Sequence, residues 1–187
     1  MEDSDAEVRS NGTYCWAVIV SNCSVSAYPY GKFLENSCLF CFRFYPEALK
    51  KLAVLFNDNS IPNLLDNAAS AAARMMLAGP TLVPMDQLMP AFLRLLPLRK
   101  DFQENEPVYK CIFELIKSSN AAIAGHMGTV LSIFAKALGS NDVQPEIQQE
   151  MVHIGKALLQ QFGSQLQTTI NSLPQTEQQN LQKYLMS

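Results

Sequence analysis

The stretch that decides the fold is Leu64–Arg99, LLDNAASAAARMMLAGPTLVPMDQLMPAFLRLLPLR. Its first half predicts an amphipathic helix, because Leu65, Ala69 and Met76 recur on one face at helical spacing. Gly79-Pro80 is expected to end this helix, since proline cannot continue the hydrogen-bond ladder. The apolar arc is wide, so the helix needs packed neighbours to be stable.

A second helix is predicted after this turn. Pro84 suits its first turn, where a missing backbone N–H is harmless. Pro90 is expected to bend the helix, because its ring clashes with the preceding turn. The apolar stripe of the helix consists of Leu88, Met89, Phe92, Leu93 and Leu96. Two such helices joined by a short turn predict an antiparallel hairpin.

Composition restricts the class of protein. The chain has 187 residues, 48% hydrophobic and 17% charged, with a formal net charge of −3. This length allows a domain with a real core, whereas the light charge argues against a nucleic-acid partner. No apolar run reaches the roughly 18 residues of a membrane span, and the acidic start, MEDSDAEVRSNG, is unlike a secretory signal. We expect a soluble, intracellular, helix-rich protein without membrane insertion.

Apolar residues at helical spacing predict further helices on both sides of the central stretch. These helices are expected within residues 3–21, 46–56, 108–117, 121–138, 145–163 and 174–187. Gly163 is expected to end the helix that Pro145 begins. Residues 31–45, GKFLENSCLFCFRFY, are aromatic and cysteine-rich and show no clean period.

Consecutive helix pairs suggest a repeat. Asn67 and Asn105 stand near the starts of two helices, 38 residues apart, and Gln148 follows 43 residues later. These separations are close to the roughly 40–47 residues of HEAT-type helical hairpins. The distance of 56 residues from Asn11 to Asn67 is too long for one repeat.

An interruption explains the long interval. Tyr28-Pro29 and Tyr45-Pro46 are near-duplicate dipeptides 17 residues apart, and leaving out 17 residues restores the period. We therefore predict an all-α fold, a HEAT-repeat (armadillo-like) α-solenoid of antiparallel helical hairpins. Its expected parts are a partial repeat with only a second helix (1–29), an insertion or gene-model artefact (30–45), three hairpins (46–80, 81–119 and 120–163) and a C-terminal capping helix (164–187).

A polar stripe is the candidate binding surface. Asn67, Ser70 and Arg74 share one face of the central helix, and Asn11 and Asn105 occupy comparable places in neighbouring repeats. The second helices of hairpin repeats line a concave side that these architectures use for partners. The five residues are therefore predicted to form a partner-binding concave face. The alternative is a solvated face, which every amphipathic helix has.

No catalytic or metal site is expected. Cys38-x-x-Cys41 has the spacing of half a zinc site, but no second ligand pair accompanies it. His126 and His153 lie in apolar helical segments without a nucleophile or carboxylate partner in a motif. There is no Gly-rich phosphate loop. The sequence thus predicts neither an enzyme nor a cofactor.

Three segments carry a family resemblance: DAEVRSNG (5–12), LLDNAASAAARMMLAGPTLVPMDQLMPAFLRLLPLRKDFQENEPVYKCIFEL (64–115) and INSLPQTEQQNLQKYL (170–185). They resemble the C-terminal HEAT repeats of importin-beta-type karyopherins, most closely the importin four and importin five branch. In that branch a DN-A-x2-A-R-M helix, a PLDQVLP-like turn and an LPL-K/R-x-D-x-x-E-N segment recur together. The matching positions here are Asp66–Met75, Val83–Pro90 and Leu96–Asn105. The resemblance covers nearly the whole chain except about Tyr30 to Tyr45.

The resemblance implies a function. Such receptors are similar to long superhelical solenoids that bind protein cargo and the GTPase Ran, and they pass the nuclear pore by contacting Phe-Gly nucleoporins. It implies nuclear import of cargo with a nuclear localisation signal, by binding and not by catalysis, in cytoplasm and nucleus. The chain would match only the end of a receptor, as a fragment, a truncated gene model or a degenerate paralogue. The alternative function is a HEAT-repeat scaffold or adaptor without a transport role.

Overall fold

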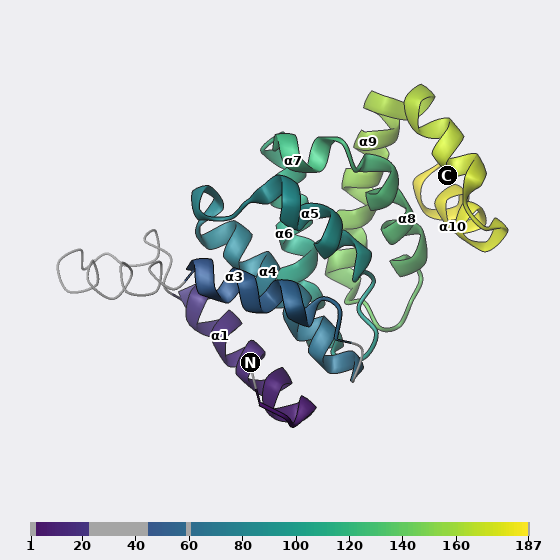
Figure 1. Ribbon diagram of the computed structural model, residues 1–187. Helices are drawn as coiled ribbons and strands as arrows, with labels where there is room; N and C mark the ends of the chain where they lie inside the picture. The colour runs from purple at the N-terminus through teal and green to yellow at the C-terminus, as the bar shows by residue number, and fades with distance from the viewer. Residues whose placement is uncertain (1–2, 23–44, 59–60, 187) are drawn as a thin grey trace. The chain divides into compact units, whose positions relative to one another are not determined.

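The computed structural model describes residues 3–22, 45–58 and 61–186, and the regular elements in these ranges are helices (Figure 1). The chain divides into two compact units, Met1–Cys111 and Ile112–Ser187. The first contains α1 (Ala6–Asn22), α3 (Tyr45–Leu55), α4 (Pro62–Ala78), a 3₁₀ turn η2 (Pro80–Leu82), α5 (Met85–Arg94) and a 3₁₀ turn η3 (Phe102–Glu104). The second contains α7 (Ala121–Ala124), α8 (Met127–Ala137), α9 (Pro145–Ser172) and α10 (Gln175–Leu185), and α6 (Asn105–Lys117) crosses the boundary.

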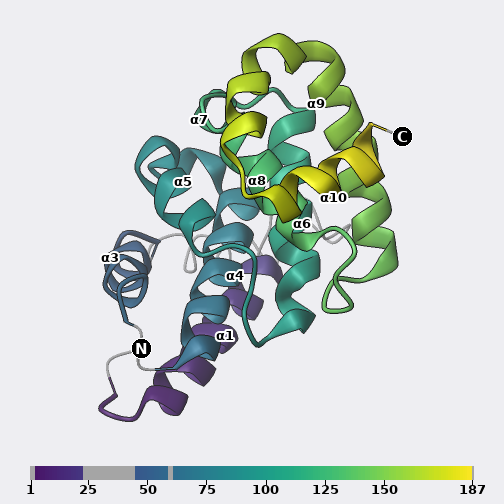
Figure 2. The same ribbon diagram turned by 90° about the vertical axis from the view of Figure 1, so that its right-hand side faces the viewer.

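Helix α4 is the centre of the first unit, because α1, α3, α5 and η3 all pack against it (Figure 2). Its residues from Leu64 to Met76 are buried, apart from the partly covered Arg74. Helix α1 faces α4 with Ser10, Thr13 and Ala17, which follow one another at helical spacing and are all buried. Small side chains on both helices allow their backbones to approach closely. This explains why α1 and α4 make the most extensive contact in the unit.

The prediction of an all-α, HEAT-repeat fold is confirmed. Helices α4 and α5 occupy 62–78 and 85–94, as the central stretch predicts, with Pro90 inside α5. All five residues of the predicted second stripe are buried, with Met89 and Phe92 at 0% exposure. Among the described residues, no helix has both the length and the apolarity that crossing a bilayer requires.

Two predicted helix boundaries are wrong. Helix α9 does not end at Gly163 but continues to Ser172. A glycine inside a helix costs only about 1 kcal/mol relative to alanine, and burial of Leu166 and Ile170 on the continuing apolar face offsets this cost. The helix expected over 121–138 is divided instead into α7 and α8, with Gly125 and His126 between them.

The predicted division into repeats is not decided by these helices. The segment predicted as an insertion, 30–45, lies outside the described residues except for Tyr45, which begins α3 and is 1% exposed. Residues 23–29 of the predicted partial repeat also lie outside them. The boundaries of the hairpins and of the capping helix stay predictions.

In the second unit, α10 packs against both α8 and α9. Asn180 on α10 donates to the carbonyl oxygen of Ala135 at 3.0 Å, and Ser132 donates to Glu177 at 3.3 Å. Tyr184 covers Gly139, whose backbone has a φ of +82°. The turn between α8 and α9 thus fits α10 only because residue 139 has no side chain.

Replacing Gly139 with alanine is expected to destabilise the chain by about 1–3 kcal/mol, because an L-residue is strained at positive φ. The new Cβ would also lie 2.7 Å from the Tyr184 hydroxyl. Gly163→Ala is the matched control: nothing lies within 4 Å of its Cβ position inside α9, so helix propensity alone predicts a gain of up to about 1 kcal/mol. Urea unfolding of both variants measures the difference, and equal shifts would contradict the predicted contact.

Candidate partner-binding site

A groove opens between α3 and α5 in the first unit, with a volume of about 420 Å³. Its apolar lining consists of Pro46, Leu49, Ala53, Phe56, Pro84, Leu88 and Ala91. The α3 wall follows from the spacing of Leu49, Ala53 and Phe56, which fall on one helical face. The groove is therefore a product of two neighbouring helices whose outer faces are not fully covered.

The rim of the groove is polar. It contains the amides of Asn57 and Gln87 and the cationic side chains of Lys50 and Arg94. Arg94 donates to the Asn57 side-chain oxygen at 3.4 Å, which links the ends of α3 and α5. An apolar floor with a few polar groups around it is the usual composition of a binding site for a side chain or small ligand.

The sequence did not predict this groove. The helix expected within 46–56 contributes the α3 wall through Leu49, Ala53 and Phe56. Sequence reasoning gave no role to Ala91 and Arg94, because they lie outside the predicted buried stripe of α5. The overlooked signal is the spacing of Gln87, Ala91 and Arg94, which fall at i, i+4 and i+7.

The predicted polar stripe lies inside the first unit. Asn67 is 4% exposed and donates to the Ser10 hydroxyl of α1 at 2.9 Å. Ser70 is fully buried and donates to Glu104, and Arg74 contacts both of them in an ion-paired network. These side chains hold α1 and the segment before α6 against α4.

The other two residues of the predicted partner-binding face, Asn11 and Asn105, differ in exposure. Asn105 is 1% exposed, whereas Asn11 lies on the surface of α1. The structure therefore does not bring the five residues together on one exposed face, because α1 and η3 cover the side of α4 on which three of them lie. A partner-binding role for them stays a prediction.

Asp66 forms a second buried polar contact that sequence reasoning missed. Its carboxylate is 1% exposed and accepts the backbone N–H groups of Arg99, Lys100 and Asp101 at 2.7 to 3.2 Å. Charge-assisted bonds of this kind are stronger than neutral ones. The carboxylate thus holds the segment between α5 and η3 on α4, which we call the Asp66 clamp.

Burial raises the pKa of Asp101, and the neighbouring carboxylates of Glu104 and Asp66 raise it further. The carboxylates at this corner therefore repel one another, and the backbone N–H donors and the Arg74 guanidinium offset this repulsion.

In the second unit, Gln148 holds a turn much as Asp66 holds its segment. Its side chain accepts from the Gly139 N–H at 2.8 Å and donates to the carbonyls of Ser140 and Val143 at 2.9 and 2.8 Å. A polar side chain on a helix fixes a neighbouring loop in both units.

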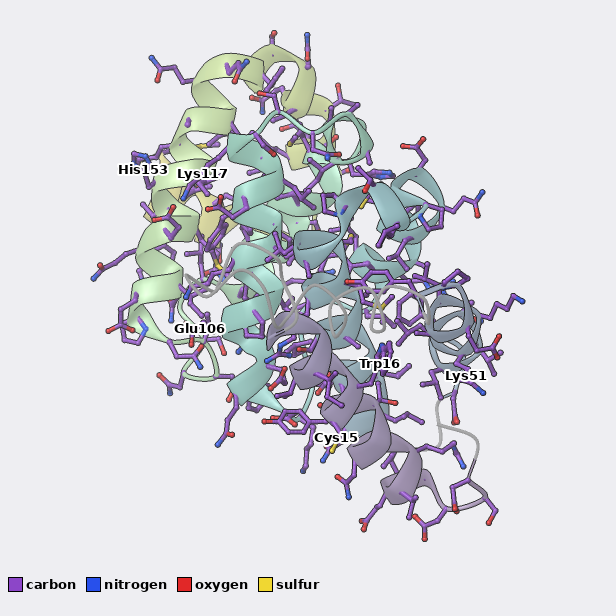
Figure 3. All side chains as sticks on the ribbon, turned by 90° about the vertical axis from the view of Figure 1, so that its left-hand side faces the viewer. Cys15, Trp16, Lys51, Glu106, Lys117 and His153 are labelled. Atoms are coloured by element: carbon purple, nitrogen blue, oxygen red, sulfur yellow. The ribbon has the colours of Figure 1, made fainter. Side chains whose placement is uncertain are left out.

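Among the described residues, the other candidate groups do not form a metal site. Within the part of the chain that the structure describes, no cluster of three His, Cys, Asp or Glu residues could hold a metal ion. Cys38 and Cys41 lie outside that part. Cys111 is buried, which raises the pKa of its thiol to about 12, and a thiol of this kind is inert. His153 lies on the exposed face of α9 (Figure 3).

Comparison with known proteins identifies relatives. No family model matches the chain. It is 30% identical over 166 residues to the probable importin subunit beta-4 of Schizosaccharomyces pombe, covering 88% of this chain and 14% of that protein. It is 26% identical over 184 residues to human importin-4 and 23% identical over 180 residues to mouse importin-4, covering 98% and 96% of this chain and 16% and 15% of those proteins.

The chain thus spans about one seventh of the length of the relatives that it matches. The aligned part includes nearly all of the described helices, since the human relative aligns over 98% of the chain. Together with the all-α repeat fold, these relatives show that the chain is homologous to a segment of the importin-beta-type karyopherins.

Proposed function

We propose that the chain acts as a segment of a nuclear transport receptor, which binds protein partners by surface contacts and carries cargo between cytoplasm and nucleus. Protein cargo, the GTPase Ran and Phe-Gly nucleoporins are the proposed partners. The homology to importins and the repeat fold support the family part of this proposal. The α3–α5 groove supports the binding part.

The observation that carries the proposal is the apolar α3–α5 groove, whose size and lining suit a Phe-Gly segment. Its volume of about 420 Å³ suffices for one aromatic ring and the backbone beside it. Aromatic anchors in apolar pockets contribute strongly to association because they bury a large area. The amides of Asn57 and Gln87 stand at the rim, where they suit the backbone of an extended peptide.

Ala53→Gln tests the groove, because Ala53 lines it and a longer side chain there would fill part of its volume. We expect a fluorescent Phe-Gly peptide to lose about tenfold or more in affinity for the variant, measured by anisotropy, because an anchor pocket is blocked. Val54→Gln is the matched control: Val54 is the next residue, is 71% exposed and does not line the groove.

Two results would contradict the proposal. The first is a wild-type chain that does not bind the Phe-Gly peptide, and the second is equal binding by the Ala53 and Val54 variants. Glutamine is compatible with an exposed helix position, so circular dichroism should show both variants folded. A scaffold or adaptor without a transport role would bind neither this peptide nor Ran in its GTP form.

A further inference from the structure

The charged residues that line the α3–α5 groove are both cations. Its lining contains two cations, Lys50 on α3 and Arg94 on α5, and no Asp or Glu. The chain as a whole carries a formal net charge of −3, so this local excess of positive charge runs against the overall balance. Charge of one sign around an apolar site selects partners of the opposite sign.

Both cations are available for a ligand. Lys50 has an ion pair with Glu47 at 3.9 Å, but the two side chains are 78% and 59% exposed. Such a pair contributes little and is easily replaced. Arg94 is exposed and donates a 3.4 Å hydrogen bond to the neutral Asn57 side chain. Its planar guanidinium retains donors that match a carboxylate.

The separation of Lys50 and Arg94 along the groove can be estimated from their positions on α3 and beside it. Arg94 lies beside Asn57 at the end of the groove, and Lys50 precedes Asn57 by seven residues along the α3 segment. The five residues from Lys50 to the end of α3 at Leu55 rise by about 7.5 Å, and the two turn residues that follow bring the distance along the segment to about 10 Å. In an extended peptide, about three residues cover the same distance.

We propose that the groove prefers an aromatic residue bracketed by acidic residues about three positions apart, as in the peptide pattern Glu-Phe-Gly-Glu, with Lys50 and Arg94 binding the two carboxylates. The inference rests on the proposed function, since it concerns the same groove and the same aromatic anchor. It adds a selection among Phe-Gly segments that the apolar lining cannot make, because an apolar wall distinguishes poorly between residues beside the anchor.

Three labelled peptides test this preference on the full chain: one core each of Glu-Phe-Gly-Glu, Gln-Phe-Gly-Gln and Lys-Phe-Gly-Lys in the same Gly-Ser context. Exposed charge pairs contribute modestly, so we expect the Glu peptide to bind about three- to tenfold more tightly than the Gln peptide. The Lys peptide should bind most weakly. Added salt should reduce the difference, because exposed charges are screened.

Variants locate the source of the preference. Lys50→Gln combined with Arg94→Gln should bring the Glu peptide to the affinity of the Gln peptide. Lys136→Gln, which changes an exposed lysine on α8 outside the groove, should leave the preference intact.

The outcomes separate the two proposals. If the Gln peptide binds but the Glu peptide gains nothing, the charge selection is wrong and the transport proposal stands. A tightest-binding Lys peptide, as the net charge of the chain alone would dictate, also overturns the selection, as does a preference that survives in the double variant. If no peptide binds, the proposed function of the groove fails and the selection fails with it.

Discussion

Replacing Asp66 with alanine is expected to lower the free energy of unfolding by about 3–4 kcal/mol, because three backbone donors lose a charged acceptor together. The carboxylate accepts from Arg99, Lys100 and Asp101 and is 1% exposed, so water does not replace it at the same place. Urea unfolding followed by circular dichroism at neutral pH measures the loss.

Two controls separate the hydrogen bonds from the change of charge. Asp66→Asn retains one side-chain oxygen, so we expect an intermediate loss of about 1–2 kcal/mol. Asp86→Ala removes an exposed carboxylate in the first turn of α5 and should cost at most about 1 kcal/mol. The importance of the Asp66 clamp would be refuted if the Asp66 and Asp86 variants unfolded at the same urea concentration.

The second large effect is expected at Glu104. Its side chain is 6% exposed and is ion-paired with Arg74, whose side chain is 15% exposed. Removing one partner of such a buried pair leaves an uncompensated charge, so Glu104→Ala should cost about 3–5 kcal/mol. Glu106→Ala is the exposed comparison, because Glu106 pairs with Lys110 on the surface of α6, and its loss should be below about 1 kcal/mol.

A triple variant distinguishes the stability that the ion-paired network contributes from the cost of leaving one of its charges unpaired. Replacing Ser70, Arg74 and Glu104 together by Ala, Met and Leu removes every member of the network. Because apolar replacement of a buried ion pair is often neutral, we expect the triple variant to regain most of the stability that Glu104→Ala loses. A triple variant that is less stable than the single one would show that the network itself, and not the stranded charge, determines stability.

The sequence was most informative where apolar spacing alone decides structure. The periodicity of Leu64–Arg99 predicted α4 and α5, and the breaker at Gly79-Pro80 predicted the end of α4. The groove itself was not predicted, although the helix expected within 46–56 forms its α3 wall. The second wall depends on how α5 lies beside α3, which is a tertiary relation that no local pattern contains.

Polar residues were harder to place. Asn67, Ser70 and Arg74 have the spacing of a solvated face, but α1 and η3 cover that face, so they bond to Ser10 and Glu104 instead. On α1, the residues packed against α4 are the small Ser10, Thr13 and Ala17, whereas Val8 and Ile19 remain 50% and 48% exposed. Hydropathy alone cannot show that a helix packs by its small residues.

The Asp66 clamp also affects how the chain meets proteases. Arg99 and Lys100 are exposed, basic and outside any helix, a combination that marks a loop for cleavage. A protease must draw an extended segment into its active site, yet the peptide N–H groups that follow these two residues are bonded to a carboxylate of α4. Cutting there first requires the segment to detach, so its resistance to proteolysis follows the free energy of that local opening and not the accessibility of its side chains.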